Sequence, residues 1–304
     1  GVRSFQNNLF RHYALQNKVP YVLTPHGSLD QTRLNTWRVV TPEKQINLET
    51  LASASSILAA SELERQELLD ADIPETRLEL RPPGIEIKPA KQREIESYRQ
   101  RRQWTDSHLG AIYLGRSDPK AGIHHLLRAY QRLKTRLPEL DLLIQILEVD
   151  EIEDWQRRAE LLEVDHGVTF CGPLTFEERA LALSAADVVV ATDRNPGVEL
   201  APLEGLLCGT PVVVSKASGV GELLQPCNGA FFFPASDVEV LAVGLLQALT
   251  EERNTKERLK SGRAFVQTHL NWNDIAEQLE GVYEETLQSV STPAAVELTE
   301  TVHS

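Results

Sequence analysis

The chain has 304 residues, of which 41% are hydrophobic and 25% charged, and this composition is typical of a soluble globular protein with a sizeable core. No apolar run approaches the ~20 residues of a membrane-spanning helix. The 31 Lys and Arg against 44 Asp and Glu give a net charge of −13, which disfavours a nucleic-acid-binding protein. Three scattered cysteines do not suit a disulfide framework or a zinc site, and they favour a reducing compartment such as the cytoplasm.

The first third of the sequence predicts a small unit that alternates helices and strands. Helices are expected at 4–17 and 43–54, and short buried strands at 20–24, 56–60 and 78–80. The sequence from Ser61 to Glu64 has the form of a capping box, so another helix is expected to begin there. A charge-rich stretch, 88–104, indicates a hinge or a surface helix that leads into a second unit.

From residue 105 the alternation is regular. Six short apolar stretches predict buried strands at 111–114, 142–147, 168–171, 188–191, 211–215 and 230–233. Helices are expected between and after them, at 123–136, 151–163, 176–185, 201–208, 218–224, 237–250, 254–268 and 273–288. This pattern predicts an α/β fold with a doubly wound parallel sheet, whereas the first unit has only about three strands and is expected to be incomplete.

Two loops at the ends of these strands carry residues suited to binding an anion. The loop from Gly115 to Gly122 presents Arg116 and Lys120, and two cations match the charge of a diphosphate. The loop from 192 to 199 runs into a helix that contains Glu204, whose carboxylate could hold ribose hydroxyls. The sequence lacks the glycine-rich fingerprints of dinucleotide-binding and P-loop proteins, and the motifs of zinc proteases and serine hydrolases.

Several further motifs follow one another in a characteristic order. They are Gly115-Arg116, Phe170-Cys171-Gly172-Pro173-Leu174, Pro202-Leu203-Glu204-Gly205, Cys208-Gly209-Thr210-Pro211, Gly219-Val220-Gly221-Glu222 and, earlier in the chain, Thr24-Pro25-His26-Gly27. Over about residues 4–288 the chain resembles the family 4 glycosyltransferases. That resemblance implies a GT-B-like fold of two Rossmann-type units, with the start of the first one missing, and a retaining transfer of sugar from a nucleotide-diphosphate sugar to an acceptor.

The resemblance also implies a division of the chain and a role for each site residue. It places a partial acceptor-side domain at 1–104, a donor-binding domain at 105–270, a helix that crosses back at 271–288, and a disordered tail at 289–304. The expected roles are catalytic for His26 and Glu199, diphosphate binding for Gly115, Arg116 and Lys120, and ribose and sugar binding for Asn195, Gly197, Val198 and Glu204. No bound cofactor and no metal are expected, since the donor is a substrate.

Three positions depart from the family pattern. Ala121 stands where a lysine is expected, with Lys120 one residue early, and Pro196 stands where a glutamate is expected eight residues before Glu204. The usual asparagine of a later turn is Pro83. These departures keep a second hypothesis open, namely a non-catalytic or partly degenerate nucleotide-sugar-binding fragment or a subunit of a split GT-B enzyme. A nucleotide-sugar hydrolase or epimerase is a third.

The expected partners follow from the same reasoning. They are a nucleotide-sugar donor and a carbohydrate or lipid-linked acceptor, without nucleic acid. Only about 25 residues precede His26, so a homo-oligomer or a partner chain is expected to cover the incomplete first unit. A cytoplasmic location is expected, with a peripheral membrane contact at the cytoplasmic face as a further option.

Overall fold

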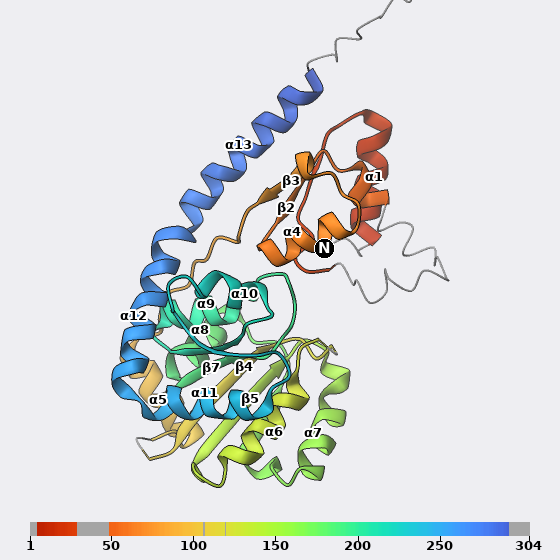
Figure 1. The fold of residues 1–304 in the computed structure, drawn as a ribbon. Helices are drawn as coiled ribbons and strands as arrows, with labels where there is room; N and C mark the ends of the chain where they lie inside the picture. Colours follow the sequence, from red (N-terminus) through yellow and green to blue (C-terminus); the bar gives the residue numbers. More distant parts are fainter. Residues whose placement is uncertain (1–4, 29–48, 106, 119, 292–304) are drawn as a thin grey trace, which may run out of the picture.

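The computed structural model describes residues 5–28, 49–105, 107–118 and 120–291. Within these ranges the chain forms two parallel β-sheets, one of three strands and one of six, each accompanied by helices. Figure 1 shows the smaller sheet with α1 and α4 on one side of the molecule and the larger sheet with α5–α12 on the other, while α13 runs from the second unit alongside the first. The predicted α/β class, with two parallel-sheet units, is confirmed.

The first unit is built on the strand order β1-β2-β3. Its strands are β1 (Val22–Leu23), β2 (Ser56–Ala59) and β3 (Leu78–Leu80), and its helices are α1 (Phe5–Asn17) and α4 (Glu62–Asp70), with a short 3-10 turn at Glu75–Arg77. Strand β2 is buried along its whole length because it lies between the other two strands and beneath α4. Leu51, Ile57 and Leu68, all fully buried, form the centre of this small core.

The second unit has the strand order β6-β5-β4-β7-β8-β9. Its strands are β4 (Leu109–Gly115), β5 (Leu140–Ile146), β6 (Val168–Cys171), β7 (Val188–Ala191), β8 (Val212–Ser215) and β9 (Phe231–Phe233). All pairings between neighbouring strands are parallel. The order runs outwards in one direction from β4 and in the other from β7, which is the arrangement of a doubly wound Rossmann sheet.

Helices cover both faces of this sheet, so its strands read as nearly continuous apolar runs. The helices are α5 (Gln92–Arg102), α6 (Ile123–Leu133), α7 (Ile152–Leu161), α8 (Phe176–Ala185), α9 (Leu200–Cys208), α10 (Gly219–Leu224), α11 (Val238–Thr250), α12 (Glu252–His269) and α13 (Trp272–Ser291). One core lies between the sheet and α6, α7 and α11, and a second lies on the α5, α8, α9 and α12 face. No helix in the described ranges is long and apolar enough to cross a bilayer.

The predicted elements agree closely with these bounds. Every predicted strand is present, and α8 has the predicted limits, Phe176–Ala185. Of the helix predicted at 43–54, residues 49–53 are helical and the rest lies outside the described residues, as does the tail from 292 onward. The capping box at Ser61 is half right: Ser61 Oγ accepts from Glu64 N at 3.0 Å, whereas the Glu64 carboxylate bonds elsewhere.

The chain returns toward its first unit through α13, which in Figure 1 runs from α12 past β3. At the start of this helix, Ile85 N donates to Leu270 O at 2.7 Å and Ile85 forms a parallel bridge with Asn271. The Trp272 ring packs against Gly84 so closely that a Cβ there would lie 2.1 Å from Cε3 of the ring. The segment after β3 and the start of α13 are therefore joined, while the domain boundaries named above remain a prediction.

Candidate functional site

The carboxyl ends of β4 and β7 mark the point where the strand order reverses. In open α/β sheets this reversal leaves a crevice in which ligands bind, because the loops from the two strands diverge to opposite faces. The loop 115–122 follows β4 and the loop 192–199 follows β7. Both loops that the sequence singled out therefore meet at this crevice.

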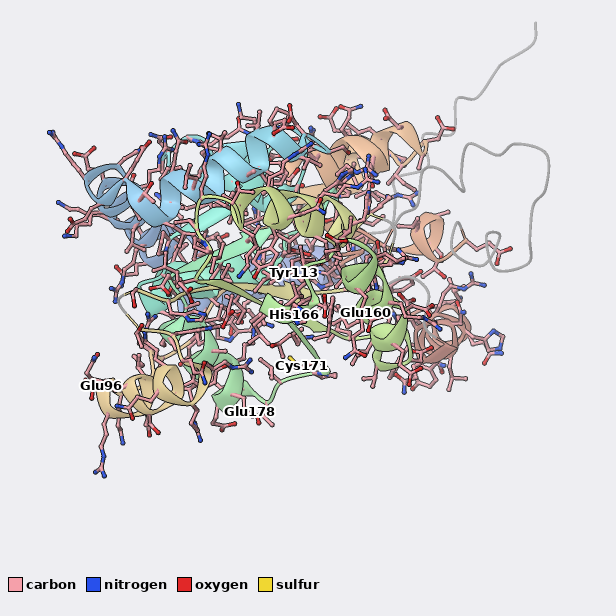
Figure 2. The ribbon with its side chains drawn as sticks, turned by 90° about the horizontal axis from the view of Figure 1, so that it is seen from below. Glu96, Tyr113, Glu160, His166, Cys171 and Glu178 are labelled. Carbon is pink, nitrogen blue, oxygen red and sulfur yellow. The ribbon has the colours of Figure 1, made fainter. Side chains whose placement is uncertain are left out.

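The loop after β4 carries the predicted phosphate-binding cations. Tyr113, which lies in the middle of the molecule in Figure 2, donates from its hydroxyl to Arg116 O at 2.8 Å and so fixes the loop to the sheet. The Arg116 side chain is 60% exposed and pairs with Asp118 at 3.3 Å and with Glu148 at 3.1 Å. Its positive charge is thus balanced by two carboxylates, which the sequence analysis did not foresee.

The two loops are bonded to each other by one side-chain and one backbone hydrogen bond. Thr192 Oγ1 donates to Ala121 O at 2.6 Å, and Arg194 N donates to Lys120 O at 3.0 Å. Ala121, which stands at the expected lysine position, is 3% exposed and packs in the core. A side chain at position 121 therefore lies in the core, whereas Lys120 is half-buried.

Two carboxyl groups lie buried beneath the loop after β7. Asp193 is 2% exposed, and both of its oxygens and Oε2 of Glu199 are buried away from solvent. Burial raises the pKa of Glu199 to about 7. Burial and the neighbouring Glu199 charge raise the pKa of Asp193 well above its usual range. The pair therefore retains a proton at neutral pH.

Glu204 lies on the second turn of α9 and is 8% exposed. Its Oε2 accepts from Nε of Arg179 at 2.5 Å, and Arg179 comes from the first turns of α8. Arg179 therefore donates a charge-assisted hydrogen bond to the carboxylate that we expected to hold ribose hydroxyls. Nothing in the spacing of the sequence indicated this partner, because the two residues lie on separate helices.

His26 projects from a tight turn at the end of β1. Ser28 N donates to Pro25 O at 3.2 Å, and the two central residues have positive φ, 53° at His26 and 69° at Gly27. This is the backbone of a type I′ turn, which glycine adopts freely and histidine only at a cost of about 1 kcal/mol or more. Partial burial lowers the pKa of His26, so the imidazole is neutral at pH 7.

This turn touches the loop after β7 in the second unit. A Cβ on Gly27 would lie 1.7 Å from Asn195 Oδ1, and a Cβ on Gly197 would lie 2.7 Å from the carbonyl carbon of His26. Asn195 Oδ1 also accepts from Gly197 N at 3.0 Å, which holds this loop in shape. Both glycines are needed because the two backbones meet without room for side chains.

The structure thus gathers most of the predicted site residues at one place. His26, Asn195 and Gly197 meet directly, and Gly115, Arg116 and Lys120 lie on the adjoining loop. Val198 packs on the core, and the Oε2 atom of Glu199 is buried beside Asp193. Among the described residues no group of three His, Cys, Asp or Glu side chains could hold a metal ion.

Comparison with known proteins identifies a family and several relatives that are similar to this chain. Residues 94–284 match the family described as glycosyl transferases group 1. A GDP-mannose-dependent monoacylated alpha-(1-6)-phosphatidylinositol monomannoside mannosyltransferase of Corynebacterium glutamicum is 26% identical over 66% of this chain and 54% of its own. A D-inositol 3-phosphate glycosyltransferase of Corynebacterium jeikeium is 26% identical over 88% of this chain and 67% of its own. The chain spans about half the length of the first curated relatives it matches.

Solved structures resemble the fold at lower sequence identity. HepE of Anabaena in complex with UDP-glucose superposes with a TM-score of 0.81 at 18% identity, over 92% of this chain and 76% of that one. WaaG, a glycosyltransferase involved in lipopolysaccharide biosynthesis, gives 0.71 at 14% identity, over 93% of this chain and 80% of that one. These neighbours support the GT-B architecture of the two units.

Proposed function

The chain belongs to the group 1 glycosyltransferases, and we propose that it transfers a sugar from a nucleotide-diphosphate sugar to an acceptor hydroxyl with retention of configuration. The observation that carries this proposal is the contact between the His26 turn and the Asn195–Gly197 loop. It places a histidine from the first unit at the crevice of the second. A donor bound at the switch point would have its sugar beside this contact.

The loop after β4 is proposed to hold the donor diphosphate. Gly115 lets the backbone approach the phosphates, and Arg116 and Lys120 supply positive charge. Because Arg116 is already paired with Asp118 and Glu148, phosphate binding requires its guanidinium to exchange these carboxylates for phosphate oxygens. These cations would then stabilise the charge that develops on the departing phosphate.

The second loop and α9 are proposed to hold the ribose and the sugar. Glu204 offers its carboxylate to ribose hydroxyls while the bond from Arg179 orients it. Asn195, Gly197 and Val198 line the approach to the sugar. For Glu199 to act in catalysis as proposed, its carboxyl must turn away from Asp193. His26 already lies beside the Asn195–Gly197 loop.

The chemistry then needs little from the protein beyond positioning and charge. The bond between the anomeric carbon and the diphosphate oxygen breaks, and a bond to the acceptor oxygen forms on the same face. The acceptor proton passes to the departing phosphate. His26, neutral at pH 7, can accept a hydrogen bond from the donor sugar or the acceptor without adding charge.

The acceptor class is proposed from the relatives. Those named above act on a phosphatidylinositol mannoside or an inositol phosphate, so a carbohydrate or a lipid-linked acceptor is proposed here. We also propose a cytoplasmic location with a peripheral membrane contact. A partner chain or a second copy of this chain is proposed to cover the first unit. No bound metal or cofactor is part of it.

A non-catalytic nucleotide-sugar-binding chain is the second candidate. Three observations favour it: Ala121 is buried where a lysine is expected, Pro196 replaces a carboxylate, and Arg116 is paired with two acids. Such a chain would bind the donor without turning it over, alone or as a subunit of a split enzyme.

Calorimetric titration of the purified chain with UDP, GDP and ADP and with their glucose and mannose conjugates tests both candidates. We expect one nucleotide to bind, with affinity reduced about tenfold or more in Arg116→Ala and in Glu204→Ala. Arg157→Ala, which removes an exposed arginine on α7, is the matched control and should bind as the parent does. A transfer assay with the bound donor then separates enzyme from binding protein, and absence of binding by every nucleotide would contradict both.

A further inference from the structure

Glu64 is a fully buried glutamate in the first turn of α4, 0% exposed. Its two carboxylate oxygens accept from two backbone N–H groups: Oε2 from Ala60 at 2.7 Å, and Oε1 from Gly27. The positive end of the α4 dipole also favours the negative charge at this place. One carboxylate therefore ties the start of α4 to the turn that carries His26.

The His26–Gly27 turn needs stabilising contacts from residues outside it. His26 and Gly27 both have positive φ, which is a costly backbone for histidine, so the turn persists only where its surroundings fix it. The bond from Gly27 N to Glu64 is a contact at its centre that comes from outside the turn. Without it, the strain at His26 would favour relaxation of the loop away from the crevice.

The same helical turn is also fixed to the second unit. The Glu222 carboxylate of α10 accepts from Glu62 N at 2.7 Å and from Leu63 N at 2.9 Å. Ser61 Oγ donates to Pro196 O at 2.5 Å, next to Gly197, which touches His26. Figure 1 shows α4 on the side of the first unit that faces α10. The start of α4 thus contacts both the His26 turn and the loop that this turn faces.

From these contacts we infer that Glu64 is a positioning residue: its buried carboxylate holds the His26–Gly27 turn against the Asn195–Gly197 loop. This inference rests on the proposed function insofar as it concerns catalysis. The positioning role requires a carboxylate at residue 64, because both of its oxygens must accept a hydrogen bond from a backbone N–H group. A glutamine can accept with one atom only, and its NH₂ group would face a second N–H donor.

The variant Glu64→Gln tests the inference in the full chain, with Glu75→Gln as the control. Glu75 lies in the same unit, and its side chain is 71% exposed. The first readout is the NMR titration of the His26 ring, assigned by the signal that disappears in His26→Asn. In the parent chain the pKa of His26 should be depressed; in Glu64→Gln it should move toward 6.5, and in Glu75→Gln it should not change.

The second readout is kinetic. With a donor that the parent chain turns over, Glu64→Gln should lower kcat by about 10- to 100-fold and leave the donor Kd within about twofold. In a His26→Ala background the same substitution should have no further effect, because its target is gone. Losses that add in the double variant would show a general structural role and overturn the inference.

The two readouts separate this inference from the proposed function. Absence of transfer by the parent chain contradicts the proposed function, while the His26 titration still tests Glu64. An unchanged His26 signal in Glu64→Gln overturns the inference whatever the activity. Where Glu64→Gln yields too little folded protein, Glu64→Asp keeps two acceptors with shorter reach, and it should give a smaller shift of His26 in the same direction; no shift would overturn the inference.

Discussion

At the scale of single residues, the buried carboxyl pair makes stability depend on pH. The pKa of Glu199 is about 7 in the folded chain, against 4.5 for an ordinary glutamate. Below pH 4.5 both folded and unfolded forms are protonated there, and the contribution to stability is fully present. As the pH rises from 4.5 through 7, only the unfolded form has lost its proton, so stability falls.

Glu199→Gln mimics the protonated side chain and should remove the part of this dependence that Glu199 contributes. Relative to the parent chain, the variant should gain stability between pH 5 and 8, by ~3 kcal/mol at most, and should differ little near pH 4.5. Urea unfolding at several pH values measures the difference. Glu160→Gln on α7, an exposed position, serves as the control and should follow the parent curve. A constant difference across this pH range would contradict the raised pKa.

At the scale of secondary-structure elements, the start of α4 shows how a helix end can join two units. An N-terminus leaves several N–H groups without partners inside the helix, and here Ser61 and Glu222 satisfy three of them. Since Glu222 belongs to α10, the cap is also a contact between the first and the second unit. The two bonds to Glu222 therefore stabilise both the start of α4 and the contact between the two units.

Glu222→Ala removes two of these bonds together. We expect a loss of about 1 kcal/mol in the free energy of unfolding, the usual value for a lost cap, and a larger radius of gyration by small-angle scattering. Glu177→Ala, an exposed glutamate in the first turn of α8, should change neither quantity by a comparable amount. Unfolding and scattering curves that match the parent would show that the contact does not hold the units together.

At the scale of the whole molecule, the connection after β3 and the start of α13 meet where the two units join. Gly84 lies against the Trp272 ring, with no room for a Cβ. Gly84→Val should displace the ring and reduce the free energy of unfolding by about 1–3 kcal/mol, and Trp272→Ala in the same chain should restore part of the loss.

Thermal denaturation of these variants checks the packing at this joint. Gly281→Ala in the middle of α13 is the control, because a Cβ there meets nothing within 4 Å and alanine favours a helix. This control should be as stable as the parent or slightly more so. A Gly84→Val chain that melts with the parent would show that Trp272 does not secure the crossing.

The elements of this protein were predictable because their signals are local. Apolar runs such as those of β7 and β8, and the capping residues of α8, lie within a few neighbours in the sequence. The parallel topology followed from the regular alternation, and the two loops at 115–122 and 192–199 followed from the rule that ligands bind at strand ends. Glu204 was singled out from the second of these loops, whereas His26 was indicated only by the resemblance to the family.

The partners of these residues were decided only by the tertiary structure. The pairs Arg179–Glu204 and Glu148–Arg116 and the bonds of Glu222 to α4 join residues from separate elements or loops, and no spacing along the chain encodes such a contact. Glu64 shows the difference most clearly. Its sequence context predicted a local cap, but burial beside the His26 turn offered its carboxylate the N–H groups of Gly27 and Ala60 instead. Local sequence determines which groups need partners, and packing decides which partners they find.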